Sequence, residues 1–184
     1  MNKVSIIIGS KSDSSTMEKT KEILDELEIP YEFNVISAHR DLEKLRDYVS
    51  NASKENIKVF ITAAGGAAAL PGVVAAMTNL PVIGVPIGSS SLKGIDALMS
   101  IVQMPPGIPV ACVAVGSWGA RNAAYLAASI LALKHEDIKK NYSDYRHNLS
   151  SPSILQDQHL PRYSIGNPLL LVNFQGILLL ISYN

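Results

Sequence analysis

The sequence predicts an α/β protein in which a five-stranded parallel sheet is covered by helices on both faces. Two observations lead to this prediction. Short apolar runs alternate with amphipathic helical segments along most of the chain, and the first run, VSIII, is rich in β-branched residues, as is typical of a buried parallel strand. A chain of 184 residues is long enough for one such domain with a sizeable core.

The first elements each carry a local signal. Residues 4–8 predict the first strand, which ends at a Gly-Ser turn. Apolar side chains on one side predict a helix over residues 13–27, and Pro30 stops it. The run YEFNVIS, residues 31–37, predicts the second strand, and apolar residues at helical spacing predict a helix over residues 41–52.

The alternation continues through the second half of the chain. The helices there are rich in alanine, which favours close packing either inside the domain or between subunits. In parallel sheets, ligands bind at the carboxyl ends of the strands, so the loops that follow the strands are the candidate sites. The remaining expected elements are strands over residues 57–62, 81–85 and 109–115, and helices over residues 67–77, 92–102 and 122–133.

Composition argues against several classes of protein. Lys+Arg and Asp+Glu both total 16 and no basic stripe appears, so no nucleic-acid partner is expected. The single cysteine, Cys112, permits no disulfide within the chain, which fits a reducing cytosol and predicts a cytoplasmic protein. Cys112 lies in the apolar run VACVAV, which indicates a small buried hydrophobe rather than a reactive thiol. The amino-terminal run is too short for a signal peptide.

The alternation stops towards the carboxyl end. This predicts a nucleotide-binding domain over residues 1–148 and a C-terminal arm or atypical extension over residues 149–184. Residues 168–184 carry no charge, but Asn173 and Gly176 interrupt them, and they are shorter than the ~20 residues of a membrane-spanning helix. No membrane association is therefore expected.

The loop after the first strand, GSKSD, favours an anion site. Ser10, Ser12 and their backbone N–H groups face the start of a helix, where the partial positive charge attracts anions. The alternative is simple helix capping by Ser12 or Asp13. The loop matches neither the GxxxxGK[ST] phosphate loop nor the GxGxxG dinucleotide fingerprint, so a dinucleotide is disfavoured.

The loop after the second strand, SAHRD, contains the histidine with the clearest functional context. His39 is the only histidine of the chain at a strand end, and an imidazole can take or give a proton near neutral pH. Arg40 beside it can bind a phosphate with a forked pair of N–H donors. A purely structural role for His39 is the alternative, because single loop histidines are more often structural than catalytic.

The loop after the third strand, AAGGAAALPG, offers no acid, base or nucleophile. Gly65 and Gly66 allow a ligand to approach the backbone closely, and the apolar surroundings suit a flat ring or a small neutral molecule. A tight turn from strand to helix is the alternative. The loop after the fourth strand contains three serines, which suit the rim of a polar site. No cluster with metal-ligand spacing and no Ser-His-Asp arrangement appears, so no metal is expected.

Taken together, the segments GSKSD, SAHR, GGAAALPGVVAA, LPVIGVP, SIVQMPPGIPVACVAVG and GARNAAYLAASILA resemble the bacterial-type (class I) N5-carboxyaminoimidazole ribonucleotide mutases of purine biosynthesis. The resemblance runs from about Val4 to Arg146. It implies a flavodoxin-like three-layer sandwich, a homo-octamer, and a reaction without metal or organic cofactor. In that reaction a carboxylate moves from the exocyclic N5 of an aminoimidazole ribonucleotide to ring carbon C4.

The resemblance also implies roles for individual residues. His39 would be the general acid/base that relays a proton between N5 and C4, and Arg40 would bind the phosphate. The loop at Gly65 and Gly66 would hold the base and the transient carbon dioxide. The full substrate-binding set that the resemblance implies is Ser10, Ser12, Asp13, Ser37, Ala38, Arg40, Gly65, Gly66, Ala69 and Leu70.

The sequence departs from the family at two places. The family's third loop reads GGAAHLPG, and Ala69 stands where the histidine is expected. The apolar extension at the carboxyl end is the second departure. Two alternatives therefore stay open: a carboxylase that uses free carbon dioxide, and a catalytically weakened nucleotide-binding variant. A flavodoxin-type electron carrier is disfavoured, because the three loops contain no aromatic residue to flank a flavin.

Overall fold

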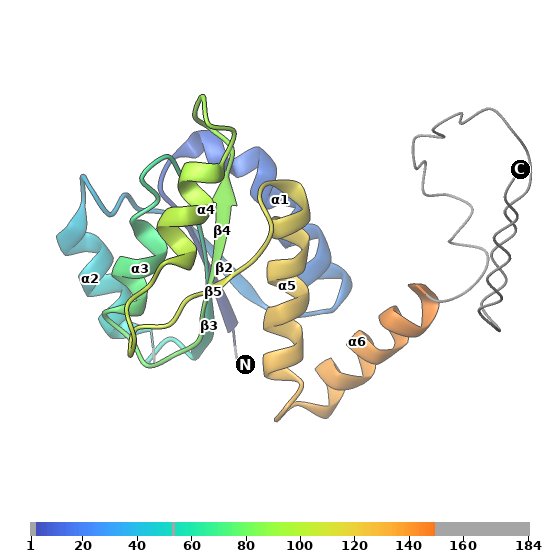
Figure 1. Ribbon diagram of the computed structural model, residues 1–184. Coiled ribbons are helices and arrows are strands. Elements are labelled where there is room, and N and C mark those ends of the chain that lie inside the picture. Colours follow the sequence, from blue (N-terminus) through green and yellow to red (C-terminus); the bar gives the residue numbers. More distant parts are fainter. Residues whose placement is uncertain (1–2, 53, 150–184) are drawn as a thin grey trace, which may run out of the picture.

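A computed structural model describes residues 3–52 and 54–149, and its five strands form one parallel sheet in the order β2-β1-β3-β4-β5 (Figure 1). The predicted α/β fold with a five-stranded parallel sheet is confirmed, and this strand order is that of flavodoxin-like proteins. The strands are β1 Lys3–Ile8, β2 Tyr31–Val35, β3 Ile57–Gly65, β4 Val82–Ile87 and β5 Ala111–Cys112.

Helices cover both faces of the sheet, which gives the three expected layers (Figure 1). Following the short 3-10 helix η1 Lys11–Asp13, the α-helices are α1 Ser14–Glu26, α2 Leu42–Asn51, α3 Leu70–Ala75, α4 Ile95–Val102, α5 Ser117–Leu131 and α6 Glu136–Leu149. α1 and α5 pack on one face, while α2, α3 and α4 pack on the other. None of the helices within residues 3–52 and 54–149 is long and apolar enough to cross a membrane.

The central strands are buried on both sides, as their apolar runs predict. In β3, Val59 and Ile61 face the core under α1 and α5, whereas Phe60 faces the core under α2, α3 and α4. All three side chains are fully buried. Strand order reverses between β1 and β3, so the loops after these two neighbouring strands flank the crevice where such sheets bind ligands.

The small residues of α5 serve packing inside the domain. Five alanines of this helix are fully buried, and a Cβ at Gly119 would lie 1.7 Å from the carbonyl oxygen of Ala114. Thr20 of α1 donates a hydrogen bond of 2.8 Å to the carbonyl of Ala120. The backbone of α5 can therefore approach its neighbours closely. Packing inside the domain is one of the two uses expected for these alanines, the other being packing between subunits.

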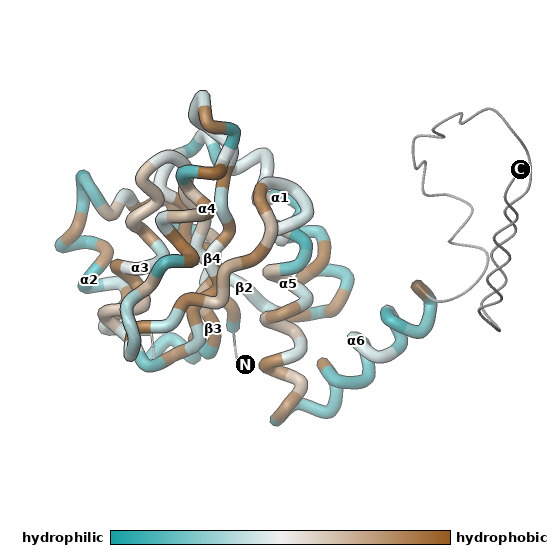
Figure 2. The backbone as a smooth tube through the Cα atoms, in the orientation of Figure 1, coloured by the Kyte–Doolittle hydropathy of each residue, from teal (hydrophilic) through white to brown (hydrophobic). Residues whose placement is uncertain are grey.

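The last helix, α6, was not predicted from the sequence. It is mostly hydrophilic, so no long apolar face indicates it (Figure 2). No strand separates it from α5, so the alternation of strands and helices along the chain does not indicate it either. It docks through stacked aromatic rings instead, with the centroid of Tyr125 lying 4.9 Å from that of Tyr145 and 6.1 Å from that of Tyr142. The expected arm at 149–184 begins in the last residue of this helix and otherwise lies outside the described residues.

Several predicted boundaries differ from those observed. α3 begins at Leu70 rather than at residue 67, because positive φ angles at Gly66 (60°) and Ala68 (32°) keep the preceding residues in a turn. α5 begins at Ser117, ahead of the predicted residue 122. β5 is an edge strand that pairs with β4 at only two positions, so it is shorter than the predicted 109–115.

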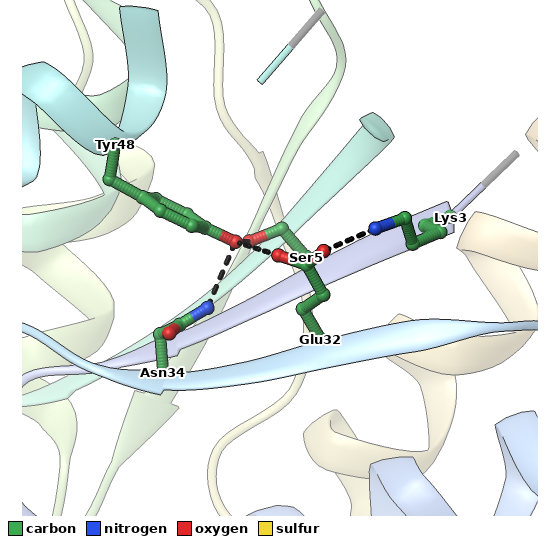
Figure 3. A network of polar contacts seen from close by, with 5 residues as sticks. All are labelled: Lys3, Ser5, Glu32, Asn34 and Tyr48. Carbon is green, nitrogen blue, oxygen red and sulfur yellow. Dashed lines mark hydrogen bonds and ion pairs between the residues drawn. The ribbon is translucent and has the colours of Figure 1, made fainter. Parts of the chain in front are cut away.

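A polar network joins α2 to the first two strands (Figure 3). The Tyr48 hydroxyl donates to Glu32 Oε2 at 3.0 Å, accepts from Asn34 Nδ2 at 2.9 Å, and lies 2.8 Å from the Ser5 hydroxyl. A tyrosine has one proton to give and a carboxylate can only accept, so Ser5 must donate to Tyr48. Lys3 pairs with the other oxygen of Glu32.

We expect Tyr48→Phe to lower the free energy of unfolding by about 1–3 kcal/mol, because the fully buried Ser5 hydroxyl would lose its acceptor. The effect should also depend on pH. Burial raises the pKa of Tyr48 to about 12, so the native state holds its proton after the unfolded chain has lost it. The contribution of Tyr48 to stability is thus lost as the pH rises from about 10 to about 12. Phenylalanine does not titrate, so this part of the fall in the free energy of unfolding should be absent from Tyr48→Phe.

Urea denaturation at pH 7 and across the alkaline range measures both effects. Tyr31→Phe is the control at pH 7, because the Tyr31 hydroxyl makes one exposed hydrogen bond, 3.3 Å to Asp25. Equal stability losses in the two variants at pH 7 would contradict the special role of the network.

Candidate active site

A cavity of about 360 Å³ lies at the carboxyl ends of the strands, where the loops after β1, β2, β3 and β4 meet. Its position at the reversal of strand order is the one expected for a ligand site in this type of sheet. The residues that line it are Gly9, Ser10, Ser12, Asp13, Ser37, Ala38, His39, Arg40, Ala64, Gly65, Ala68, Ala69, Leu70 and Ser89.

This cavity brings together every residue of the expected site except Gly66. Gly66 does not line the cavity; its φ of 60° supplies the turn that separates β3 from α3. A larger hollow of about 680 Å³ lies at the opposite end of β4, between residues 75–82 and residues 107–111. Its lining carries no charged or titratable side chain, so the smaller cavity is the candidate active site.

The loop after β1 is organised by its own serines. Ser10 caps η1 by accepting a hydrogen bond from the Ser12 N–H at 3.3 Å, and the Ser12 hydroxyl lies 2.9 Å from Ser10 Oγ and 3.2 Å from Asp13 Oδ1. Asp13 stands at the N-cap position of α1 but makes no capping hydrogen bond there. Asp13 therefore occupies the N-cap position that the capping alternative expected but does not cap α1, and the side-chain cap in this loop is that of η1, from Ser10.

The carboxyl of Asp13 is buried beside the cavity, with only 5% of the residue exposed. Burial raises the pKa of Asp13, while hydrogen bonds from the Ser12 side chain and the Ser10 backbone lower it in part. Burial therefore disfavours the charged form of this carboxyl group unless a hydrogen-bond donor stabilises it. A hydroxyl group of a ligand can be that donor.

The loop after β2 places His39 and Arg40 at the exposed mouth of the cavity. Arg40 Nε donates to Ser37 Oγ at 3.3 Å, and Arg40 Nη2 donates to the carbonyl of Gly9 at 3.4 Å. Arg40 therefore connects the loop after β2 with the loop after β1. Two of its five N–H donors make these bonds, so the guanidinium retains donors for an anion.

Small residues form the third side, called here the Gly/Ala wall: Ala64, Gly65, Ala68 and Ala69. Ala69 lies at the N-cap position of α3, is half-buried and makes no capping hydrogen bond. Leu70 follows the wall in the sequence, also lines the cavity and is almost fully buried. The wall offers backbone and methyl groups, which suits a weakly polar ligand.

Gly65 is required for close packing at this wall. A Cβ at Gly65 would lie 1.9 Å from Ser89 Oγ and 3.0 Å from the carbonyl oxygen of Ile87. We expect Gly65→Ala to destabilise the fold by about 1–3 kcal/mol through overpacking. The double variant Gly65→Ala with Ser89→Ala should recover part of this loss, because it removes the shortest contact.

Thermal or urea denaturation of the two variants tests this expectation. Gly9→Ala is the matched control, since a Cβ at Gly9 would meet nothing within 4 Å. A double variant no more stable than Gly65→Ala alone would show that Ser89 does not set the cost.

Cys112 and the acidic residues form no further centre. Cys112 is half-buried rather than fully buried, and burial raises the pKa of its thiol, which disfavours the reactive thiolate. Within the described residues, no group of three His, Cys, Asp or Glu side chains could hold a metal ion.

Sequence reasoning missed one polar residue of the cavity, Ser89. The serine-rich segment after β4 was recognised as a possible rim, but three consecutive serines gave no sign of which one faces the cavity. The close approach of Ser89 to Gly65 depends on the distance between two neighbouring strands, which only the structure supplies.

Comparisons with known proteins find relatives over most of this chain. The family model of AIR carboxylase matches residues 3–151. Curated relatives named N5-carboxyaminoimidazole ribonucleotide mutase, from Pyrococcus abyssi and Bacillus subtilis, are each 52% identical to this chain. The two alignments cover 81% and 79% of this chain, and 84% and 90% of the relatives. A crystal structure of Treponema denticola PurE, 31% identical, has a TM-score of 0.77 and covers 88% of this chain and 100% of its own.

Proposed function

Because this chain belongs to the AIR carboxylase family, we propose that it converts N5-carboxyaminoimidazole ribonucleotide into 4-carboxy-5-aminoimidazole ribonucleotide. It is then an isomerase of purine (IMP) biosynthesis. Relatives with this name share 52% identity over most of the chain, and the cavity gathers the polar residues of three loops beside an apolar wall. That gathering at the strand-order reversal is the structural observation on which the proposal rests most.

The reaction breaks the bond from N5 to the carboxylate carbon and forms a bond from that carbon to C4. A proton leaves C4 and a proton is gained at N5. Such a transfer needs a proton carrier and a closed pocket that keeps the released carbon dioxide against the ring. Proximity of this kind contributes roughly 7–11 kcal/mol in the best intramolecular cases.

We assign the ribose-phosphate end of the substrate to the loops after β1 and β2. The guanidinium of Arg40 is held by Ser37 and Gly9 and keeps donors for the phosphate. Ser10 and Ser12 offer hydroxyl groups to the same end, and Asp13 can accept from a ribose hydroxyl. Ala38 also lines the pocket.

We assign the base to the Gly/Ala wall, and the proton transfer to His39 in the loop after β2. His39 carries the proton between N5 and C4, while the Gly/Ala wall and Leu70 hold the aminoimidazole ring and the carbon dioxide. Gly66 acts indirectly, by allowing the turn that presents Gly65. Protonation and confinement account for the chemistry, so no metal or organic cofactor is assigned.

We further propose that residues 1–148 form the catalytic nucleotide-binding domain of a cytoplasmic homo-octamer, with residues 149–184 as an appended arm. An apolar stripe on and before α4 supports assembly: Leu92, Ile95, Met99 and Val102 lie at helical spacing and are 48–60% exposed. Zero net charge and a single cysteine suit a cytoplasmic protein. Sedimentation of the full chain and of a chain ending at Ser150 tests both the assembly and any part the arm plays in it.

Direct assay of the purified full chain tests the function. The chain is incubated with N5-carboxyaminoimidazole ribonucleotide, and formation of the C4-carboxylated product is followed above the spontaneous background. Product formation without added bicarbonate supports the mutase, whereas dependence on free carbon dioxide and aminoimidazole ribonucleotide would indicate the carboxylase. Ala69 favours one second candidate, a weakened nucleotide-binding variant, for which binding without turnover is the expected result.

A further inference from the structure

Ser89 contributes the cavity's only lining residue from the loop after β4. Its hydroxyl lies against Gly65, at the position where a side chain on Gly65 would begin: an ideal Cβ there would be 1.9 Å from Ser89 Oγ. The hydroxyl is therefore located at Gly65 of the Gly/Ala wall. In the sheet, β4 lies beyond β3 from β1 and β2, the strands whose loops hold Asp13 and Arg40.

The three serines of this loop differ in what their hydroxyls do. Ser90 Oγ accepts a hydrogen bond from the Leu92 N–H at 3.1 Å, and a hydrogen bond from Ser90 lowers the pKa of Asp96 at the start of α4. Ser89 and Ser91 are both exposed, but only Ser89 lines the cavity. The Ser89 hydroxyl makes no hydrogen bond to any other residue in the described part of the chain, so it can bind a ligand.

The loop that carries Ser89 is tightly folded. A Cβ at Gly88 would lie 3.2 Å from the carbonyl oxygen of Lys93, and the Lys93 N–H donates to the carbonyl of Ser90 at 3.0 Å. Gly94, with φ of 92°, returns the chain to within contact of Gly88. Because the loop closes on itself, Ser89 is held at a defined position over the wall.

Most other polar groups of the cavity already have partners. Ser10, Ser12 and Asp13 contact one another, and Ser37 pairs with Arg40. In the function proposed above, the group that moves between N5 and C4 lies over the Gly/Ala wall, which itself offers only backbone and methyl groups. A carboxylate or carbon dioxide at that place needs a hydrogen-bond donor to fix its orientation.

We propose that the Ser89 hydroxyl donates a hydrogen bond to an oxygen of the migrating carboxyl group, and so holds it for bond formation at C4. This inference rests on the mutase function proposed above and deepens it by naming a carboxylate-recognition residue. Ser89 itself exchanges no proton in the net reaction. It keeps the hydrogen bond while the N5–carbon bond breaks and the C4–carbon bond forms.

Binding measurements test the role without requiring turnover. Calorimetry on the full chain compares 4-carboxy-5-aminoimidazole ribonucleotide with 5-aminoimidazole ribonucleotide, which lacks the carboxylate. Ser89→Ala should weaken binding of the carboxylated nucleotide about tenfold, as expected for one hydrogen bond to a charged group, and leave binding of the other unchanged. Ser91→Ala, on the same loop and outside the cavity, should change neither.

The outcomes separate this inference from the function on which it rests. If the unaltered chain binds neither nucleotide, the proposed function fails and the role of Ser89 fails with it. If both bind and Ser89→Ala reduces both affinities equally or not at all, only the role of Ser89 is overturned. In a chain that turns over, Ser89→Ala should also raise the fraction of substrate lost as free carbon dioxide and aminoimidazole ribonucleotide, and an unchanged fraction would count against the proposal.

Discussion

Replacing His39 with asparagine is expected to lower the turnover number by a factor of about 10²–10⁴ while nucleotide binding persists. His39 is exposed and lines the cavity next to Arg40, in the loop after β2. Asparagine keeps a polar side chain of similar reach but cannot exchange a proton. The proton that must leave C4 and the proton that must reach N5 would then depend on water.

Steady-state kinetics and calorimetry on the same preparations measure the two quantities. His147→Asn is the control, because His147 lies on α6 and outside the cavity lining. A His39→Asn enzyme with full activity would remove His39 from the mechanism. Loss of nucleotide binding together with activity would instead assign it to substrate binding.

Ala69→His is expected to raise the turnover number about 100-fold, within the range of one added proton-transfer group. Ala69 lines the cavity at the start of α3 and is half-buried, so a larger side chain there would extend along the Gly/Ala wall. The family to which the sequence is similar has a histidine at this place. With alanine at this place, the proposed mechanism leaves both the donating and the accepting step to His39.

Ala69→Asn separates proton transfer from cavity filling, since asparagine occupies similar space without titrating near neutral pH. Equal gains in both variants would mean that shape alone matters. No gain in either would mean that the site functions with alanine, and that His39 suffices.

The central strands β1, β3 and β4 were predictable because buried parallel strands need continuous apolar runs, and the edge strand β2 was predictable because apolar residues alternate there with Glu32 and Asn34. The meeting of the loops in one candidate site was also predictable, since a parallel sheet brings the ends of neighbouring strands together regardless of loop detail. Thus Ser10, His39 and Gly65, far apart in sequence, were correctly expected at one edge of the sheet.

The features that the sequence did not predict depend on contacts between elements. α6 is held by the rings of Tyr125, Tyr142 and Tyr145, and a few spaced tyrosines in a polar segment do not predict a partner. The start of α3 depends on positive φ at Ala68, which alanine rarely adopts. Ser89 was not distinguished from its neighbours, because its position depends on the close packing of its loop against Gly65.

The network around Tyr48 has a consequence for engineering the site into another protein. Its hydrogen bonds run in one direction: Ser5 and Asn34 donate to Tyr48, and Tyr48 donates to Glu32. Replacing any single member would therefore reverse a bond or leave a donor without its acceptor. These residues fix α2 against β1 and β2, and the loop that carries His39 runs from β2 into α2. A graft that copies only the cavity residues would leave the angle of that loop unspecified. A successful graft would therefore have to transfer the cavity residues and the Tyr48 network together.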